Sequence, residues 1–436
     1  MKLSKHKLGE LIEVTRGASL SGQFYAEKGE LIRLTLGNFN MNGGGFKENT
    51  SKTNLYYTGT VKDEFILNKG DIITPLTEQS LGLLGTTARI PESGKYIQSQ
   101  DVALVKCKEG LLDPNFCYYL ISSSVVRQQL SAGAQQTKIR HTSPDKIKDC
   151  TAWVPELEVQ KRIGRILYDI DEKIALNRQI NDNLEAIAKQ LYDYWFVQFD
   201  FPNEEDKPYK SSGGAMVWNE KLKREIPEGW EVKQLRDIIE TNRGISYNTS
   251  SISGGGVPMI NLASFNVDGS YKDTGLKSYN GNYTQEKILR PFDLVLCNTQ
   301  QTAIEFSKDI IGKAFLIPDI FDGDIVSSHH INTIKTEEVL KPYLAYLSNT
   351  YHFHKYATGC CSGTNILGLD YNSFSQYKLE IPPKYLLKEF RDFIIDIGKR
   401  KSLIIKENKL LTKQRNELLP LLMNGQASVN YHLSAC

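Results

Sequence analysis

A few stretches of the chain carry residue types that could perform catalysis. Asp145, preceded by Pro144, and the later Asp171-x-Lys173 follow the Pro-Asp…Asp-x-Lys order of metal-dependent nucleases, but Lys173 falls within the heptad repeat of a long predicted helix. Histidines occur together at His329-His330 and at His352-x-His354, without a Cys or carboxylate at zinc-ligand spacing beside them. We therefore expect no metal site and no nuclease centre.

The sequence motifs of ATP hydrolysis and methyl transfer are also missing. There is no Gly-x-x-x-x-Gly-Lys-[Ser/Thr] loop, no Asn-Pro-Pro-aromatic or Asp-Pro-Pro-aromatic run, and no glycine-rich cofactor fingerprint after a strand. Gly43–Gly45 and Gly254–Gly256 are not followed by a helix start, which favours loop tips over phosphate sites. The sequence predicts a non-catalytic protein that binds no cofactor itself, and a self-contained methyltransferase or nuclease is the least favoured alternative.

Composition indicates a globular protein of several domains. The chain has 436 residues, of which 40% are hydrophobic and 24% charged, and it contains no apolar run long enough to span a membrane. Seven cysteines without a signal peptide favour reduced thiols in the cytoplasm. The net charge of +2 divides into about +4 for residues 1–155 and about −4 for residues 228–383. Charge alone therefore does not indicate a nucleic-acid-binding protein.

The elements that must position any functional residues are duplicated with a period of about 227 residues. The aligned segments are Leu8–Gly17 with Leu235–Gly244, Leu34–Asn40 with Ile260–Asn266, Gly70–Ile73 with Phe292–Val295, Gly85–Pro91 with Gly312–Pro318, Thr137–Arg140 with Thr364–Leu367, and Val154-Pro155 with Ile381-Pro382. Because these matches occur in one order at nearly one offset, they predict two copies of a whole domain.

Each copy begins with short apolar runs that alternate with Gly, Asn and Ser, which predicts short strands and turns. The predicted strands are 31–36, 65–67, 71–74, 102–105, 257–262 and 294–296, and helices are predicted near 115–130 and 341–356. The predicted fold class is α+β, with two pseudo-symmetric, strand-rich mixed domains separated by two long antiparallel coiled-coil helices.

A heptad pattern follows the strand-rich part of each copy. Its a positions are Ile163, Ile170, Asn177, Leu184 and Leu191 in the first copy, and Phe390, Ile397, Ile404, Leu411 and Leu418 in the second. The d positions of the first copy are Ile166, Lys173, Ile180, Ile187 and Tyr194, and the d column of the second copy is more polar. Five heptads predict an antiparallel seam about 48 Å long, with Asn177 fixing its register; an amphipathic helix on each domain's own surface is the alternative.

These features resemble the specificity subunit of type I restriction–modification systems over the whole chain. The local matches are the helix Gln160–Phe196, Phe199-Asp-Phe-Pro202, Lys207-Pro-Tyr-Lys-Ser-Ser-Gly-Gly214, Ile226-Pro-Glu-Gly-Trp230 and Leu418-Leu-Pro-Leu-Leu-Met-Asn-Gly425. The corresponding division is target-recognition domain 1 at 1–155, central spacer helix at 156–200, linker at 201–227, target-recognition domain 2 at 228–382, C-terminal spacer helix at 383–425 and tail at 426–436.

The resemblance implies that each target-recognition domain reads one half of a split site on double-stranded DNA. It also implies that the helices fix the gap between the halves and dock two methyltransferase subunits, which restriction subunits join. S-adenosylmethionine, ATP and Mg²⁺ are then expected on those partners. The alternative is a protein-interaction scaffold that never contacts DNA.

Two pairs of polar segments at equivalent places are candidates for DNA contact. Arg16 and Arg243 each precede a glycine, and either a phosphate or guanine contact or a fold-supporting salt bridge fits them equally. Thr77/Gln79 and Thr299/Gln301 each follow an apparent strand. Glutamine can pair bidentately with adenine, whereas a polar turn is the other interpretation.

A third candidate is the basic loop of Lys138, Arg140 and His141 in the first copy. The second copy has Asn365 and Leu367 at the positions of Lys138 and Arg140. If these loops read DNA, the difference is expected, because the two domains would read different half-sites.

Overall fold

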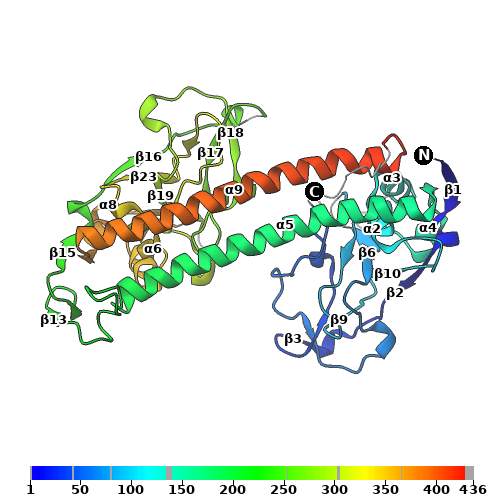
Figure 1. Ribbon diagram of the computed structural model, residues 1–436, viewed down its shortest axis with the longest axis horizontal. Coiled ribbons are helices and arrows are strands. Elements are labelled where there is room, and N and C mark those ends of the chain that lie inside the picture. The colour runs from blue at the N-terminus through cyan, green and yellow to red at the C-terminus, as the bar shows by residue number, and fades with distance from the viewer. Residues whose placement is uncertain are drawn as a thin grey trace. The chain divides into compact units, whose positions relative to one another are not determined.

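The computed structural model describes residues 2–41, 44–78, 81–133, 140–252, 254–301, 305–364 and 366–427. The chain forms two compact units: unit 1 is Met1–Leu176 with Asn408–Cys436, and unit 2 is Asn177–Glu407. Each unit contains one strand-rich domain and a stretch of each of two long helices (Figure 1). No helix among the described residues has the length and apolar character needed to cross a membrane.

Unit 1 is built on an antiparallel four-stranded sheet in the order β2-β10-β6-β8. The strands are β2 (Ile12–Arg16), β10 (Val102–Cys107), β6 (Ile72–Pro75) and β8 (Ala88–Arg89). The two central strands are runs of buried residues, because both faces of the sheet are covered. A second sheet, β3-β5-β4-β9, consists of Tyr25–Ala26, Tyr56–Tyr57, Leu31–Arg33 and Tyr96–Ile97.

Unit 2 repeats this arrangement with an antiparallel sheet in the order β16-β23-β19-β21. The strands are β16 (Glu240–Arg243), β23 (Ile331–Lys335), β19 (Leu294–Cys297) and β21 (Ala314–Leu316). Its second sheet, β18-β17-β22, consists of Lys277–Tyr279, Val257–Ile260 and Val326–Ser327. The same strand order in both units confirms the predicted duplication.

The strands that close each domain pair in identical registers. In unit 1, β1 (Leu3–Lys7) pairs with β12 (Thr151–Pro155), with Lys5 opposite Trp153. In unit 2, β15 (Glu231–Gln234) pairs with β26 (Lys378–Ile381), with Val232 opposite Glu380. Both members of the second pair lie 227 positions after those of the first, so the repeat includes the pairing register.

Three local predictions are wrong in detail. The segment 65–67 is no strand, since a short 3₁₀ turn, Asp63–Phe65, and a single bridge from Ile66 occupy it. The first predicted helix breaks into α2 (Pro114–Ser122) and α3 (Ser124–Ala132), because Ser123 between them is extended. The second breaks into α6 (Leu340–Ser348) and α7 (Tyr351–Gly359), where the Thr350 hydroxyl caps the backbone N–H of Phe353.

The segment between the two copies is folded, although its composition suggested a plain linker. A hairpin of β13 (Met216–Asn219) and β14 (Arg224–Pro227) precedes β15. The Asp200 carboxylate accepts hydrogen bonds from the backbone N–H and hydroxyl of Ser211, at 2.7 and 2.6 Å. Phe199 and Phe201 are buried against Trp230 in the core of unit 2.

The two long helices are α5 (Leu157–Tyr192), which continues into a π-helical turn at Asp193–Val197, and α9 (Lys384–Met423). Within unit 1, Leu418 and Leu422 of α9 pack in the same core as Ile163 of α5, and Arg415 binds Asp171. Residue numbers therefore rise on one helix as they fall on the other, which is the predicted antiparallel pairing.

Unit 2 contains the same antiparallel arrangement. The Asn177 amide donates to a Glu407 carboxylate oxygen at 2.7 Å, and Lys401 forms an ion pair with Glu185 further along. Asn177 is only 1% exposed, so this hydrogen bond satisfies a polar side chain in the seam. A buried polar pair of this kind favours one register over others.

The predicted a residues face the other helix, but the residues beside them in the seam are not the predicted d residues. Ile180, Ile187 and Tyr194, at predicted d positions, are exposed, whereas the residues one position later line the seam. The observed companions are Leu167, Ile174, Asn181, Ala188 and Trp195 on α5, and Ile394, Lys401, Asn408, Arg415 and Leu422 on α9. The predicted a residues are buried or half-buried throughout. On α9 the shift is not uniform, because Glu407, itself at a d position of the second copy, bonds Asn177 in the seam.

Candidate nucleic-acid interface

Arg16 and Arg243 end equivalent strands of the two central sheets. Arg16 lies opposite Ala103 at the end of β2, and Arg243 lies opposite Asn332 at the end of β16. Both side chains are exposed. The Nε of Arg243 donates to the backbone carbonyl of His329 at 2.9 Å. This contact is a hydrogen bond to the backbone and not the fold-supporting salt bridge of the alternative. DNA contact stays a prediction for both arginines.

The glycine after each arginine allows two segments to pass unusually close together. A Cβ on Gly17 would lie 2.3 Å from the carbonyl oxygens of Gln98 and Ser99, and one on Gly244 would lie 2.2 Å from that of Ser328. The chain then continues as a parallel bridge, Ala18 with Ser99 and Ile245 with Ser328. Only glycine fits this crossing, which explains the repeated Arg-Gly pair.

The other candidate segments of each domain are brought together by strand pairing. In unit 1, β7 (Thr77–Glu78) pairs with β11 (Arg140–His141), with Glu78 opposite Arg140. In unit 2, β20 (Thr299–Gln301) pairs with β25 (Ile366–Leu369), with Gln300 opposite Leu367. Segments more than 60 residues apart in the sequence are therefore neighbours in each domain, and the partner strand is polar in unit 1 but apolar (Ile366–Leu369) in unit 2.

Arg140 is tied to a buried acid that the sequence did not single out. Glu78 is 2% exposed, and its Oε2 accepts backbone hydrogen bonds from Gly82 to Leu84 at 2.9–3.1 Å. Its Oε1 lies 3.2 Å from Nη1 of Arg140, whose side chain also donates to Ser131. These contacts favour a structural role for Arg140. The only sequence signal that could have pointed to Glu78 was its place next to Thr77.

Thr77 and Thr299 lie in the paired strands β7 and β20, so the polar-turn interpretation is wrong for both threonines. Both side chains are buried, and Thr299 donates to the Asn298 side chain at 2.5 Å. DNA contact stays a prediction for them. His141, next to Arg140, is exposed. For Gln301 only the backbone is described. Three further candidates lie outside the described residues: Gln79, Lys138 and Asn365.

No group of three metal-ligating side chains occurs among the described residues. The Nδ1 of His354 instead lies 3.0 Å from the carbonyl oxygen of Ile311, and burial lowers the pKa of this histidine. Of the cysteines, those at 107, 117, 150, 297, 360 and 361 form no disulfide. Burial raises the pKa of Cys297 to about 12, so this thiol stays protonated near neutral pH.

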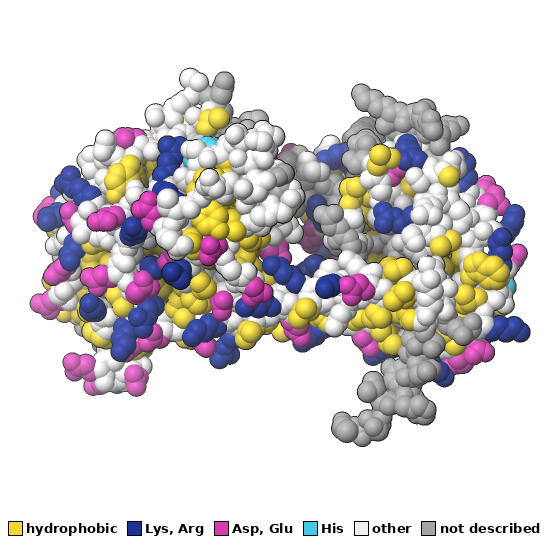
Figure 2. Space-filling view, turned by 90° about the horizontal axis from the view of Figure 1, so that it is seen from above, with side chains coloured by type: hydrophobic (Ala, Val, Ile, Leu, Met, Phe, Trp, Pro, Cys, Tyr) yellow, Lys and Arg dark blue, Asp and Glu magenta, His cyan; other side chains and the backbone are white. Residues whose placement is uncertain are grey.

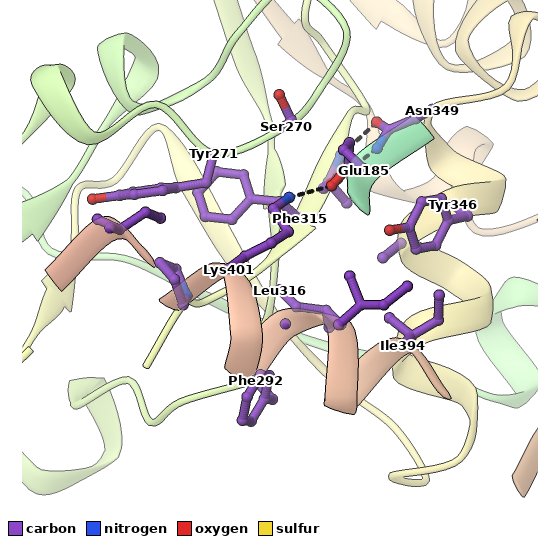
Figure 3. Close-up of a pocket in the computed structure, with 16 residues that line it drawn as sticks. Glu185, Ser270, Tyr271, Phe292, Phe315, Leu316, Tyr346, Asn349, Ile394 and Lys401 are labelled. Atoms are coloured by element: carbon purple, nitrogen blue, oxygen red, sulfur yellow. Dashed lines mark hydrogen bonds and ion pairs between the residues drawn. The ribbon is translucent and has the colours of Figure 1, made fainter. Parts of the chain in front are cut away.

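A cavity of about 110 Å³ in unit 2 lies between the helices and the domain (Figure 3). Figure 3 shows Glu185 of α5 joined to Lys401 of α9, with Tyr346 of α6 and Phe315 of β21 around them. Burial and the nearby Glu185 carboxylate hold the pKa of Tyr346 well above its usual value. The site joins helix to domain through a tyrosine, an acid and a cation.

Unit 1 has the corresponding arrangement at the corresponding tyrosine. The Tyr119 hydroxyl, 227 positions before Tyr346, donates to Asp171 at 2.6 Å, and Arg415 donates to the other oxygen of this carboxylate at 2.7 Å. In both units the acid is on α5 and the cation on α9. Each domain is therefore anchored to both helices by a three-residue contact.

Two copies of one domain, each with the same strand pairing and each anchored to both of two antiparallel helices, define a duplicated recognition protein. The fold is similar to that of the S subunit of a type I restriction–modification system from M. genitalium. This likeness has a TM-score of 0.58 at 14% identity and covers 97% of this chain and 96% of that one.

The chain belongs to the family of type I restriction modification DNA specificity domains, which matches residues 2–186 and again 227–412. It is 22% identical over 325 residues to the specificity subunit of the type I restriction enzyme MjaIX of Methanocaldococcus jannaschii, covering 74% of this chain and 71% of that subunit. It is likewise 22% identical over 385 residues to the HindI specificity subunit of Haemophilus influenzae, covering 76% and 81%. Membership confirms the resemblance and the DNA sequence-specificity role.

Proposed function

We propose that this chain selects the DNA site of a type I restriction–modification enzyme, with each target-recognition domain reading one half of a bipartite sequence. The observation that carries the proposal is the duplication at the level of pairing register: equivalent strands in the two units meet equivalent partners. Two equal scaffolds with different exposed side chains are suited to two different half-sites.

The paired helices α5 and α9 are proposed to set the gap between the half-sites. Two readers linked by a stiff connection gain avidity, since the second contact becomes intramolecular. A fixed gap also makes spacing part of the specificity, because half-sites one helical turn apart lie about 34–36 Å from each other. The division proposed is that made from the sequence, with recognition domains at 1–155 and 228–382 and spacer helices at 156–200 and 383–425.

The helices are also proposed to dock two methyltransferase subunits. Four large apolar side chains are exposed along α5 and the π-helical turn that continues it: Leu176, Ile180, Ile187 and Tyr194. An exposed apolar stripe on a helix is the usual surface for a partner helix. Catalysis is proposed to reside on the partners, with S-adenosylmethionine, ATP and Mg²⁺ bound by methyltransferase and restriction subunits.

The proposal is tested by mapping modified bases genome-wide in cells with and without this chain, in the presence of its methyltransferase subunit. One bipartite motif with a fixed gap is expected, and it should vanish when the chain is removed. A methylation pattern that does not depend on the chain would instead favour the scaffold that never contacts DNA.

A further inference from the structure

We propose that a cluster of cationic and aromatic side chains at the Arg243 end of the unit 2 sheet is the surface through which the second recognition domain contacts DNA. The cluster consists of Arg243, Tyr247, Lys277, Lys287, His329 and His330. This proposal rests on the proposed function and assigns one of its two reading surfaces to specific residues.

Backbone contacts hold three members of the cluster at one place. Gly244 brings the chain against the loop before β23, where Ile245 donates its N–H to Ser327 at 2.7 Å and accepts one from His329 at 2.8 Å. Arg243 donates to the His329 carbonyl, and the imidazole rings of His329 and His330 lie 3.8 Å apart between centroids. The arginine and both imidazoles are therefore presented together.

The two lysines reach the same place from other segments. Lys287 donates to the Asn242 side chain at 2.6 Å and to the Arg243 carbonyl at 2.8 Å. Lys277 of β18 donates to the Tyr247 hydroxyl at 2.9 Å, and the Tyr247 ring lies 5.6 Å from that of His329. Figure 2 shows histidine and Lys/Arg side chains next to one another on unit 2.

The charges of the cluster are not balanced by acids. Within the described part of the chain, none of Arg243, Lys277 and Lys287 forms an ion pair with a carboxylate. This grouping of cations occurs in the domain whose net charge is about −4. Like charges held together without counter-charges repel each other, and a polyanion such as the DNA backbone relieves that repulsion.

The imidazoles are suited to read bases rather than phosphates. Burial is the main cause that lowers the pKa of His329 and His330, and the neighbouring Arg243 lowers both further. Both rings are therefore neutral at pH 7 and can donate and accept hydrogen bonds. The Nδ1 atoms of both are buried without a hydrogen-bond partner among the described residues. Because these Nδ1 atoms are shielded, a hydrogen bond to a base has to be made by the Nε2 atoms.

The equivalent place in unit 1 carries different chemistry on the same scaffold. Arg16 lies opposite Ala103 and Arg243 lies opposite Asn332, so Ala103 and Asn332 are at equivalent positions. His329 and His330, which precede Asn332, therefore correspond to Gln100 and Asp101, which precede Ala103. An arginine common to both domains, with different neighbours in each, is what two readers of different half-sites require.

The test uses the complex of the full chain with its methyltransferase subunits and duplexes built on the mapped site: intact, with one half scrambled, or with the other half scrambled. Lys277→Gln with Lys287→Gln should lower affinity about 10-fold and reduce the salt slope by about 0.9 for each phosphate that is no longer neutralised. Lys384→Gln, a charge change elsewhere in unit 2 at a lysine paired with Glu337, is the matched control and should change neither.

His329→Ala with His330→Ala should reduce discrimination against scrambling of one half by about 10-fold and leave the other half unaffected. Arg16→Gln should act on the opposite half. Unchanged slope and discrimination in variants that assemble normally would overturn the assignment of the cluster, as would an equal effect of Lys384→Gln. A wild-type complex that prefers no duplex would overturn the proposed function itself.

Discussion

The contact of Tyr119, Asp171 and Arg415 gives a sharp test of how the first domain is anchored to both helices. Asp171→Asn keeps the shape of the side chain but removes the charge that faces the Arg415 guanidinium at 2.7 Å. The Arg415 side chain is only 11% exposed and that of Asp171 is 28% exposed. Removing Asp171's charge therefore leaves a nearly buried cation without its counter-charge.

The cost can be bounded from burial. Breaking a fully buried pair costs about 3–5 kcal/mol, whereas an exposed pair contributes about 0.2–1 kcal/mol. Because Asp171 keeps some solvent, we expect about 2 kcal/mol. The matched variant Glu185→Gln breaks the pair with Lys401 in unit 2, where both side chains are more exposed. It should cost less than about 1 kcal/mol.

Hydrogen exchange of the full chain, followed by mass spectrometry, reads both contacts in one sample. In Asp171→Asn, peptides of α9 around 411–423 should exchange about 30-fold faster, the factor that corresponds to about 2 kcal/mol, while those around 386–401 stay unchanged. In Asp171→Asn with Arg415→Met, much of the protection should return, since the unpaired cation is gone. Equal effects of Asp171→Asn and Glu185→Gln would refute the argument from burial.

Three further predictions concern packing, pH and docking. Gly17→Ala should lower stability by more than about 2 kcal/mol in thermal unfolding, because its Cβ would lie 2.3 Å from two carbonyl oxygens, whereas Gly254→Ala, with nothing within 4 Å, should be neutral. Burial raises the pKa of Tyr118 to about 12, so its contribution is present below pH 10 and about 2–3 kcal/mol is lost as pH rises from 10 to 12. Tyr118→Phe should make the loss of stability between pH 10 and 12 smaller by that amount in a denaturation profile, while the other buried tyrosines keep contributing. Ile180→Gln with Ile187→Gln should weaken assembly with the methyltransferase subunit, measured by sedimentation, and leave unfolding unchanged, since both side chains are exposed; loss of stability would contradict the assignment of this stripe to docking.

Much of the architecture was predictable because it depends on patterns that repeat along the chain. Arg16 and Arg243, and Val154 and Ile381, align at one offset, and this offset reappears in the strand registers. The helix boundaries near 157 and 384 followed from long heptads. The breaks at Ser123 and Thr350 could not be predicted in the same way, because extended backbone and side-chain capping at single residues leave the apolar periodicity unchanged.

The candidate interface was only partly predictable. The polar segments around Thr77 and Arg140 were recognised separately, but the sequence carried no sign that Glu78 would meet Arg140 across a strand pair. His329 and His330 were recognised as a pair and weighed only as metal ligands. Their grouping with Lys277 and Lys287 depends on close crossings of segments 30 or more residues apart.

By itself, the sequence determined the two copies, the two long helices and the heptad a positions that begin with Ile163. Each of these is a local or periodic property of residue types. Only the tertiary structure decided which neighbouring column completes the seam. The rejected column, with Ile180 and Ile187, has as many apolar or aromatic residues on α5 as the column that lines the seam, four of five, so hydrophobicity alone does not choose between them. The domains packed against the helices bear on this choice, because Tyr119 binds Asp171 and Tyr346 lies beside Glu185, both on α5. These contacts go with a rotation of α5 that leaves Ile180 and Ile187 exposed.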